Sequence, residues 1–293
     1  MKIGANGITL EVDDQGPAGG PPLLLIMGLG MQLIAWPQEM VAQLLARGFR
    51  VIRFDNRDIG LSQHFDGVRT PSVPWSAMRY AMHLKVRAPY SLRDMAADAL
   101  GVLDALGIER AHVCGASLGG MIAQHLAAEN PHRLRSLTLL MTTAGARSLP
   151  QPSMAVRQVL IKRPAGNDAA AVVAHLQRVF TVIGSPAYPA EPAQLRQRLL
   201  ASVQRSWHPS GTTRQLLAVM ADGDRTPLLA SIRTPTCIIH GEADPLIPVA
   251  AGHHLVQHVR GATADFIPGM GHDLPEPLLP RIVAGMAENA ARA

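Results

Sequence analysis

A chain of 293 residues, 47% hydrophobic and 17% charged, can bury a large aliphatic core, which excludes a disordered protein and leaves one domain or two. The formal net charge is +5, and no apolar run reaches the ~20 residues of a membrane-spanning helix. We see no signal peptide at the N-terminus, and the two cysteines form neither a CxxC pair nor a metal-type cluster. We therefore expect a reduced, cytoplasmic protein without stable membrane insertion.

Strand-type and helix-type runs alternate along the first half of the chain, which predicts a mostly parallel sheet flanked by helices. The predicted strands are residues 8–12, 23–27, 51–54, 111–114, 137–141, 236–240 and 264–268. Residues 23–27 are continuously apolar, as in a strand that is buried on both faces. Helices are predicted at residues 36–47, after the capping residue Ser91, and at residues 117–128.

The alternation stops between residues 151 and 211. Helical runs broken by prolines fill this segment, and the strand pattern resumes directly afterwards. We expect a helical cap inserted above the carboxyl edge of the sheet, where open α/β sheets bind ligands. The predicted organisation is a core of residues 1–145, a cap of residues 146–211 and a second core segment of residues 212–293. A second domain beside the core is the alternative.

The positive charge is concentrated in and next to this cap. Residues 150–215 contain eight basic residues, namely Arg157, Lys162, Arg163, Arg178, Arg196, Arg198, Arg205 and Arg214. Only Asp168 and Glu191 oppose them. We favour solvated helix faces as the interpretation, with attraction of anionic substrates or an acidic partner as the alternative. The sequence has no Arg/aromatic module that would predict binding to nucleic acid.

The most informative motif is Gly115–Gly119, with the sequence GASLG, between a predicted strand and a predicted helix. In this position a GxSxG motif places its serine on a sharp turn, where glycine-sized neighbours let strand and helix approach closely. Ser117 is therefore the candidate nucleophile. A Gly/Ser turn without chemistry is the alternative. The motif further requires an acid and then a histidine, on loops after later strands.

Both partners have candidates. The loop after strand 264–268 contains His272, the expected base, beside a glycine that lets the loop reach the serine. The loop after strand 236–240 contains Asp244, the expected acid, directly before a proline. Glu242 is a rival acid in the same loop. Asp273 would be strained in facing the ring of its sequence neighbour.

Five ordered segments resemble the α/β-hydrolase family, and the resemblance covers nearly all of the chain. They are residues 27–30 (MGLG), 55–62 (DNRDIGLS), 115–119 (GASLG), 241–245 (GEADP) and 269–272 (GMGH). Within the superfamily, the chain most resembles carboxylesterases of the aclacinomycin methylesterase type. The resemblance implies the α/β-hydrolase fold, with a mostly parallel central sheet, flanking helices and an inserted helical cap.

An oxyanion hole needs two backbone amides aimed at the developing negative charge. The motif assigns one to Leu118, the residue after the nucleophile. The resemblance assigns the other to Leu29. Met27 departs from the family pattern, because many relatives have histidine there. This substitution leaves the backbone donor intact and changes the polar support of the loop.

Two further groups have structural and functional interpretations. We expect Arg57, in the 55–58 segment, to tie neighbouring loops together, and Asp58 stands where many relatives have glycine. Some side chains could line the substrate pocket or simply fill the core: Trp75, Met78, Tyr80, Met82, Trp207 and Met220.

We expect a serine carboxylester hydrolase that cleaves small to medium esters through an acyl-enzyme, with no metal and no organic cofactor. Its expected partner is a small-molecule ester, and the sequence carries no signal for an oligomeric state. The alternatives are a C–C bond or thioester hydrolase with the same triad, and a small-molecule receptor with the same fold.

Overall fold

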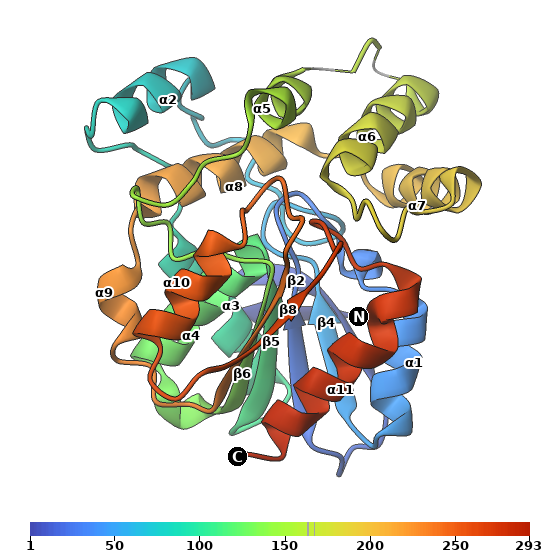
Figure 1. Ribbon diagram of the computed structural model, residues 1–293, viewed down its shortest axis with the longest axis vertical. Helices are drawn as coiled ribbons and strands as arrows, with labels where there is room; N and C mark the ends of the chain where they lie inside the picture. The colour runs from blue at the N-terminus through green and yellow to red at the C-terminus, as the bar shows by residue number, and fades with distance from the viewer. Residues whose placement is uncertain (163, 167) are drawn as a thin grey trace.

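The computed structural model of the protein describes residues 1–162, 164–166 and 168–293. Its centre is an eight-stranded sheet in the order β1-β2-β4-β3-β5-β6-β7-β8 (Figure 1). The strands are β1 (Lys2–Ala5), β2 (Ile8–Gln15), β3 (Pro22–Ile26), β4 (Arg50–Phe54), β5 (Ala111–Ala116), β6 (Leu134–Leu140), β7 (Thr236–Gly241) and β8 (Thr263–Ile267). Strand β2 runs antiparallel to both neighbours, and the other neighbouring pairs are parallel.

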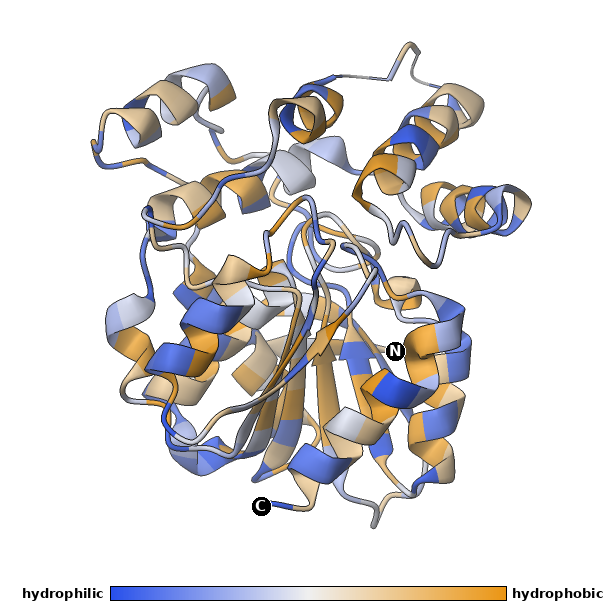
Figure 2. Cartoon of the chain, in the orientation of Figure 1, coloured by the Kyte–Doolittle hydropathy of each residue, from blue (hydrophilic) through white to orange (hydrophobic). Residues whose placement is uncertain are grey.

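Helices cover both faces of the sheet. On one side lie α1 (Gln38–Ala46) and α11 (Leu279–Ala290); on the other lie α3 (Leu92–Ala105), α4 (Leu118–Glu129) and α10 (Ala250–His258) (Figure 1). The 3₁₀ turns are η1 (Leu33–Ala35), η2 (Pro131–Arg133) and η3 (Glu276–Leu278). Figure 2 shows hydrophobic colouring along the central strands that these helices cover.

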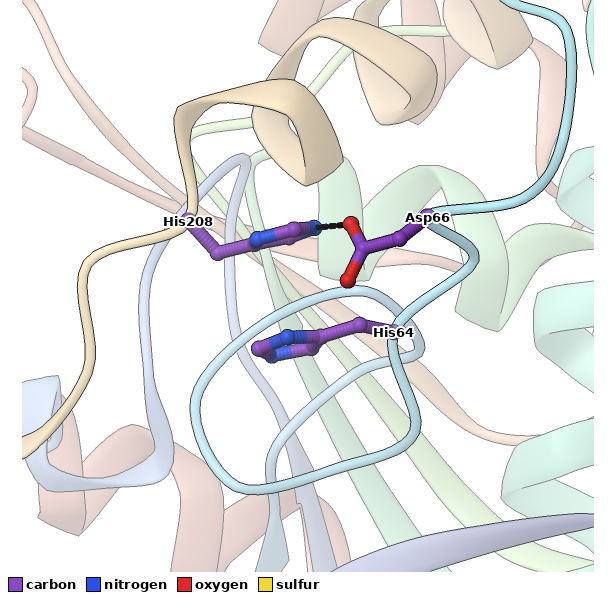
Figure 3. Close-up of side chains that lie close together, drawn as sticks. All are labelled: His64, Asp66 and His208. Atoms are coloured by element: carbon purple, nitrogen blue, oxygen red, sulfur yellow. Dashed lines mark ion pairs between the residues drawn. The ribbon is translucent and has the colours of Figure 1, made fainter.

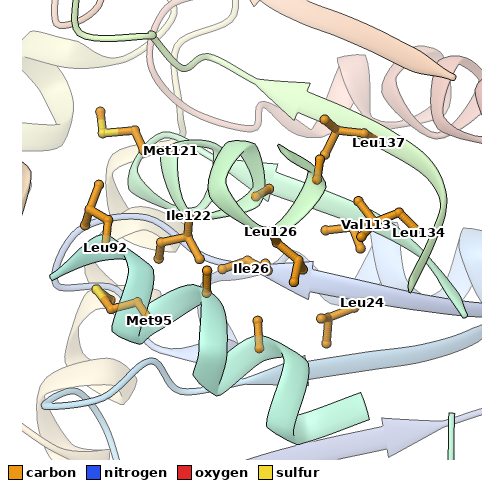
Figure 4. Packing of buried hydrophobic residues seen from close by; sticks show 14 of the residues in the cluster. Leu24, Ile26, Leu92, Met95, Val113, Met121, Ile122, Leu126, Leu134 and Leu137 are labelled. Atoms are coloured by element: carbon orange, nitrogen blue, oxygen red, sulfur yellow. The ribbon is translucent and has the colours of Figure 1, made fainter. Parts of the chain in front are cut away.

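Strand β3 shows why the central strands are mostly apolar on both faces. Leu24 and Ile26 point into the core under α3 and α4, as Figure 4 shows, whereas Leu23 and Leu25 point into the core under α1 and α11. Successive side chains of a strand alternate between faces, so a strand with helices on both sides needs an apolar residue at every position. The continuous apolar run that we read in the sequence has this origin.

The cap consists of four helices between β6 and β7, spanning residues 154–222. They are α5 (Met154–Ile161), α6 (Ala169–Ile183), α7 (Pro192–Arg205) and α8 (Pro209–Asp222), and the short helix α9 (Thr226–Leu229) leads back to the sheet. The boundary that we expected at residue 211 falls inside α8. Helix α2 (Val73–Ala81), which the sequence analysis did not predict, packs on α8 and lies on the cap side of the sheet (Figure 1).

Two ion pairs fasten the cap to the loop after β4. Arg205 Nη1 lies 2.7 Å from an oxygen of Asp55, and Arg214 makes two bonds of 2.8 Å to Asp58. Burial alone would raise the pKa of Asp58, but hydrogen bonds from Arg214 and the Phe65 amide hold that pKa below its ordinary value. Asp58 has φ +71°, a conformation that glycine adopts without strain. The loop and the cap are thus locked through charged groups that are mostly buried.

Arg57 of the same loop makes bonds of 2.6 and 2.7 Å to the buried carboxylate of Asp98 on α3. Arg57 therefore has the expected structural role, although it ties its loop to helix α3 and not to a neighbouring loop. In the part of the chain that the structure describes, every helix is too short or too polar to cross a membrane.

Candidate active site

Ser117 lies at the turn from β5 into α4, with φ +53° and ψ −117°. A positive φ is strained for a residue with a side chain and is typical of functional turns. A Cβ on Gly119 would overlap the carbonyl of Ile26, and a Cβ on Gly115 would overlap the backbone of Gly119. Both glycines of the motif are therefore required by the close approach of strand and helix.

Three side chains from three loops form a hydrogen-bonded chain. His272 Nε2 lies 3.0 Å from Ser117 Oγ, and His272 Nδ1 lies 2.7 Å from Asp244 Oδ2. The other Asp244 oxygen accepts the amides of Leu246 and Ile247 at 2.9 and 2.8 Å. When Nδ1–H donates to Asp244, the lone pair of Nε2 faces the Ser117 hydroxyl.

The neighbouring acids are engaged elsewhere. Glu242 is exposed, whereas Asp244 is buried. Asp273 accepts a hydrogen bond from the Ser185 hydroxyl, and burial raises the pKa of this carboxyl. The structure thus brings Asp244, and neither Glu242 nor Asp273, to the imidazole of His272.

A second histidine, His240 on β7, also lies near the acid. Its Nε2 is 3.5 Å from Asp244 Oδ2 and 2.8 Å from the carbonyl of Ile247, to which it donates. Burial lowers the pKa of His240, so its ring is neutral at neutral pH. The carboxylate of Asp244 therefore remains available to His272.

The loop that carries His272 is bonded to the end of α6 in the cap. The His272 amide donates to the Ile183 carbonyl at 2.7 Å, and the Gly271 amide donates to Ser185 Oγ at 2.8 Å. The Ala187 amide returns a bond of 3.2 Å to the Gly269 carbonyl. The cap and the candidate base thus share one hydrogen-bonded joint.

The loop after β3 lies against the serine. A Cβ on Gly28 would sit 3.3 Å from Ser117 Cβ, so glycine is the residue that fits there. Among the described residues, the amides of Leu29 and Leu118 have no hydrogen-bond acceptor. Amides without an acceptor, one in this loop and one directly after Ser117, are the kind of donors that an oxyanion hole needs.

Polar support for this loop comes from side chains that the sequence analysis did not single out. Asn56 Nδ2 donates to the Met27 carbonyl at 2.9 Å. The amide of Gly30 donates to Gln215 Oε1 at 3.0 Å, and Gln215 Nε2 donates to the Arg57 carbonyl at 3.0 Å. A buried glutamine of the cap helix α8 therefore holds the loop that follows Met27.

A cavity lies between this loop and the cap helices α6, α7 and α8. On the side of this loop it is lined by Gly30 and Met31. Apolar side chains from outside this loop also line it, namely Ile59, Leu176, Phe180, Leu199, Val203 and Trp207. Of the six residues that we considered for a pocket, Trp207 lines this cavity. Trp75, Met78 and Met82 instead lie exposed on the surface.

His64, Asp66 and His208 form a cluster next to the cavity (Figure 3). The two imidazole rings are stacked, with centroids 3.9 Å apart and planes 9° from parallel. The lone pairs of ring nitrogens lie in the ring plane, so stacked rings cannot direct them at one ion. Arg214 Nη2 also lies 3.0 Å from His208 Nε2. This cluster therefore has the geometry of a stacked pair beside a cation, not of a metal site.

The family model of the alpha/beta hydrolase fold matches residues 21–276. The chain belongs to the α/β-hydrolase family. Rhodomycin D methylesterases of Streptomyces sp. (strain C5) and of Streptomyces peucetius are 31% and 30% identical to it, each over 94% of both chains. A solved structure, the meta-cleavage product hydrolase of Pseudomonas fluorescens IP01, matches with a TM-score of 0.77 at 19% identity. That alignment covers 100% of this chain and 97% of the neighbour, and it shows the shared fold.

The predicted α/β-hydrolase fold is thus confirmed, and so is the resemblance to methylesterase-type carboxylesterases. The chain is a carboxylic ester hydrolase of this superfamily.

Proposed function

We propose that Ser117, His272 and Asp244 hydrolyse carboxylic esters through an acyl-enzyme. The observation that carries the proposal is the hydrogen-bonded chain from Ser117 Oγ through the imidazole to Asp244. In this reaction Ser117 Oγ attacks the ester carbonyl while His272 Nε2 takes the hydroxyl proton. His272 then gives that proton to the alcohol as the C–O bond breaks, and Asp244 stabilises the imidazolium in between.

The acyl-enzyme is hydrolysed by the same groups. Water attacks the acyl carbon, His272 accepts its proton, and Ser117 leaves as the free hydroxyl. In both steps the negative charge on the former carbonyl oxygen lies between the amides of Leu29 and Leu118. These two amides are unpaired among the described residues, as this role requires.

The proposed substrate is a small to medium ester, one part of which occupies the apolar cavity under the cap. Because the relatives are named methylesterases, methyl esters are the first substrates to test. We propose the division into a core of residues 1–145 and 212–293 and a cap of residues 146–211. Helix α8 crosses this boundary, because it begins in the cap segment at Pro209 and ends at Asp222.

The first test is covalent labelling. A fluorophosphonate should modify Ser117, as peptide mass spectrometry would show, and Ser117→Ala should lose both labelling and at least ~10⁴-fold of the esterase rate. Ser231→Ala, a matched change at a surface serine, should keep both. Near wild-type activity in Ser117→Ala would contradict the proposal.

The second test separates the ester hydrolase from the alternatives that the sequence left open. A panel should vary the acyl and alcohol parts of an ester independently and include a diketone and a thioester. We expect the highest kcat/KM with esters; faster cleavage of the diketone or thioester would contradict this. A pre-steady-state burst with a p-nitrophenyl ester, followed by turnover, would exclude a receptor that barely turns over.

A further inference from the structure

Helix α2 presents its apolar residues to solvent. Trp75, Met78 and Met82 are spaced three and four residues apart, which places them on one side of the helix and its C-cap. Their exposed fractions are 55%, 43% and 50%. Ser76 is buried on the side that packs on α8. A helix on the surface of a globular domain normally has the opposite arrangement, with its apolar stripe turned inward.

Helix α5 also exposes apolar residues. Met154 and Ile161, at its two ends, are 66% and 79% exposed, and α2 and α5 both lie on the side of the cap away from the sheet (Figure 1). Arg147 links the two regions, because its Nη1 donates to the Tyr80 carbonyl at 3.0 Å and its guanidinium lies 4.6 Å from the Tyr80 ring centroid. We call the exposed residues of α2, α5 and their flanking loops the outer cap face.

The charge of the outer cap face has one sign. Residues 67–92 contain four basic residues and no acid: Arg69, Arg79, Lys85 and Arg87. Residues 145–162 contain three basic residues and no acid: Arg147, Arg157 and Lys162. The acids that border the two segments have local partners. Asp66 contacts His208 at 3.2 Å, Asp94 forms a capping box with Ser91 on α3, and Asp168 accepts the amide of Ala171 at the start of α6.

We propose that the outer cap face binds the surface of a membrane that contains anionic lipids. Exposed Trp and Met side chains among Lys and Arg are the composition of helices that lie in the lipid interface, where the apolar side enters the headgroup layer and the cations meet lipid phosphates. Helix α2 has nine residues, so this attachment is peripheral. The inference goes beyond ester hydrolysis and does not depend on the proposed triad.

The charge also argues against a second copy of the chain as the occupant. A two-fold dimer through this face would place the same patch against itself. The Lys and Arg side chains would then meet like charges, which is unfavourable when water is excluded. An anionic lipid surface complements both the apolar and the charged part of the outer cap face.

The test is flotation of the full chain with vesicles of phosphatidylcholine containing about one third phosphatidylglycerol, in about 0.1 M NaCl. We expect flotation with these vesicles, little with pure phosphatidylcholine, and a decrease as salt is added. Lys85→Glu combined with Arg87→Glu should weaken partitioning at least ~10-fold. Met78→Ser combined with Met82→Ser should also weaken it, through the apolar part of the contact.

The matched control reverses two exposed arginines at the opposite edge of the sheet, Arg47→Glu with Arg260→Glu. This pair changes the net charge by the same amount and should leave flotation intact. Circular dichroism and a thermal unfolding curve of every variant report whether it is folded. Absence of flotation with anionic vesicles would overturn the inference, as would equal loss in the control pair. A lipid-free dimer that Met78→Ser with Met82→Ser dissociates would assign the face to a second copy instead.

Discussion

Gln215 Oε1 accepts the amide hydrogen of Gly30 at 3.0 Å, across 185 positions of sequence. The glutamine is fully buried on α8, and its own amide donates to the carbonyl of Arg57. Gly30 directly follows Leu29, whose amide is a proposed oxyanion donor. The position of that donor therefore depends on a side chain from the end of the cap.

Gln215→Met should remove this support with little change in volume. We expect kcat to fall about 10-fold with KM nearly unchanged, because a misplaced donor weakens the transition state more than the bound ester. Gln215→Glu keeps the acceptor oxygen and should lose less. Gln124→Met is the control, since Gln124 is equally buried but bonds Thr143 and Arg225. An equal loss of kcat in the control would refute the positioning role.

Asp244→Asn should lower kcat by about 10³–10⁴, because the imidazole would lose the carboxylate that fixes its tautomer and stabilises its cation. Glu242→Gln, two residues earlier in the same loop, should stay within about twofold of wild type. Steady-state kinetics with one ester decides between the two acids. A large loss in Glu242→Gln and a small one in Asp244→Asn would reverse the assignment.

Leu199→Trp should shorten the preferred ester, because Leu199 lines the cavity under the cap. In the wild type, each methylene added to the group that enters the cavity should raise kcat/KM by about fourfold until the cavity is full. In the variant this increase should stop earlier, while fluorophosphonate labelling of Ser117 stays unchanged. Arg196→Trp, an exposed change on the same helix, is the control. An unchanged chain-length profile in Leu199→Trp would contradict the placement of the ester.

The basic residues of the cap should have little influence on neutral esters. Arg205 is already paired with Asp55, and Arg196 and Arg198 are exposed. We expect kcat/KM for a neutral ester to change less than about twofold between low and high salt, because attraction between exposed charges is screened within about 8 Å. A steep fall with salt would favour the alternative that these arginines select anionic substrates.

His112 on β5 predicts a pH dependence of stability. Burial lowers the pKa of His112 to about 4, so the folded protein keeps it neutral while the unfolded chain protonates it near pH ~6.5. The neutral ring therefore costs no stability above the pKa of the unfolded chain. As the pH falls from that pKa toward the pKa of the folded protein, the free energy of unfolding decreases. Through His112 alone, acidification from about pH 7.5 to about pH 5 should lower the free energy of unfolding by about 2 kcal/mol.

Urea unfolding of His112→Leu at both pH values measures this contribution. On acidification, the free energy of unfolding of the variant should decrease by about 2 kcal/mol less than that of the wild type. His132→Leu, an exposed histidine nearby in the chain, should behave as wild type. An identical pH dependence in wild type and His112→Leu would show that this ring does not control acid stability.

The parts of the fold that follow from local patterns could be predicted from the sequence. The apolar strands, the turn at Ser117 and the order of the loops with Asp244 and His272 each have a local signature. Strand β1 was missed because it is four residues long and only its last residue is buried. Helix α2 was missed although its apolar residues have helical spacing, because it is only nine residues long and has a proline in its first turn.

Gln215 had no signature at all. A single glutamine in a helix becomes significant only when the tertiary structure places it beside Gly30. The same holds for Ser185 and Asp273, whose bond joins the cap to the loop of the base. Sequence reasoning finds residues whose role is set by their neighbours in the chain, and it misses those whose role is set by packing between distant segments.

The joint between residues 183–187 and the loop of His272 has a consequence for the evolution and redesign of the cap. Lengthening or shortening α6 would transmit a displacement to the imidazole through the backbone bond between His272 and Ile183. Substrate range can therefore vary freely only through side chains that line the cavity, or through exchanges that end before Ile183. In a chimaera that carries a relative's cap, His272 should keep its position only if residues 183–187 and the loop that contains His272 come from the same parent.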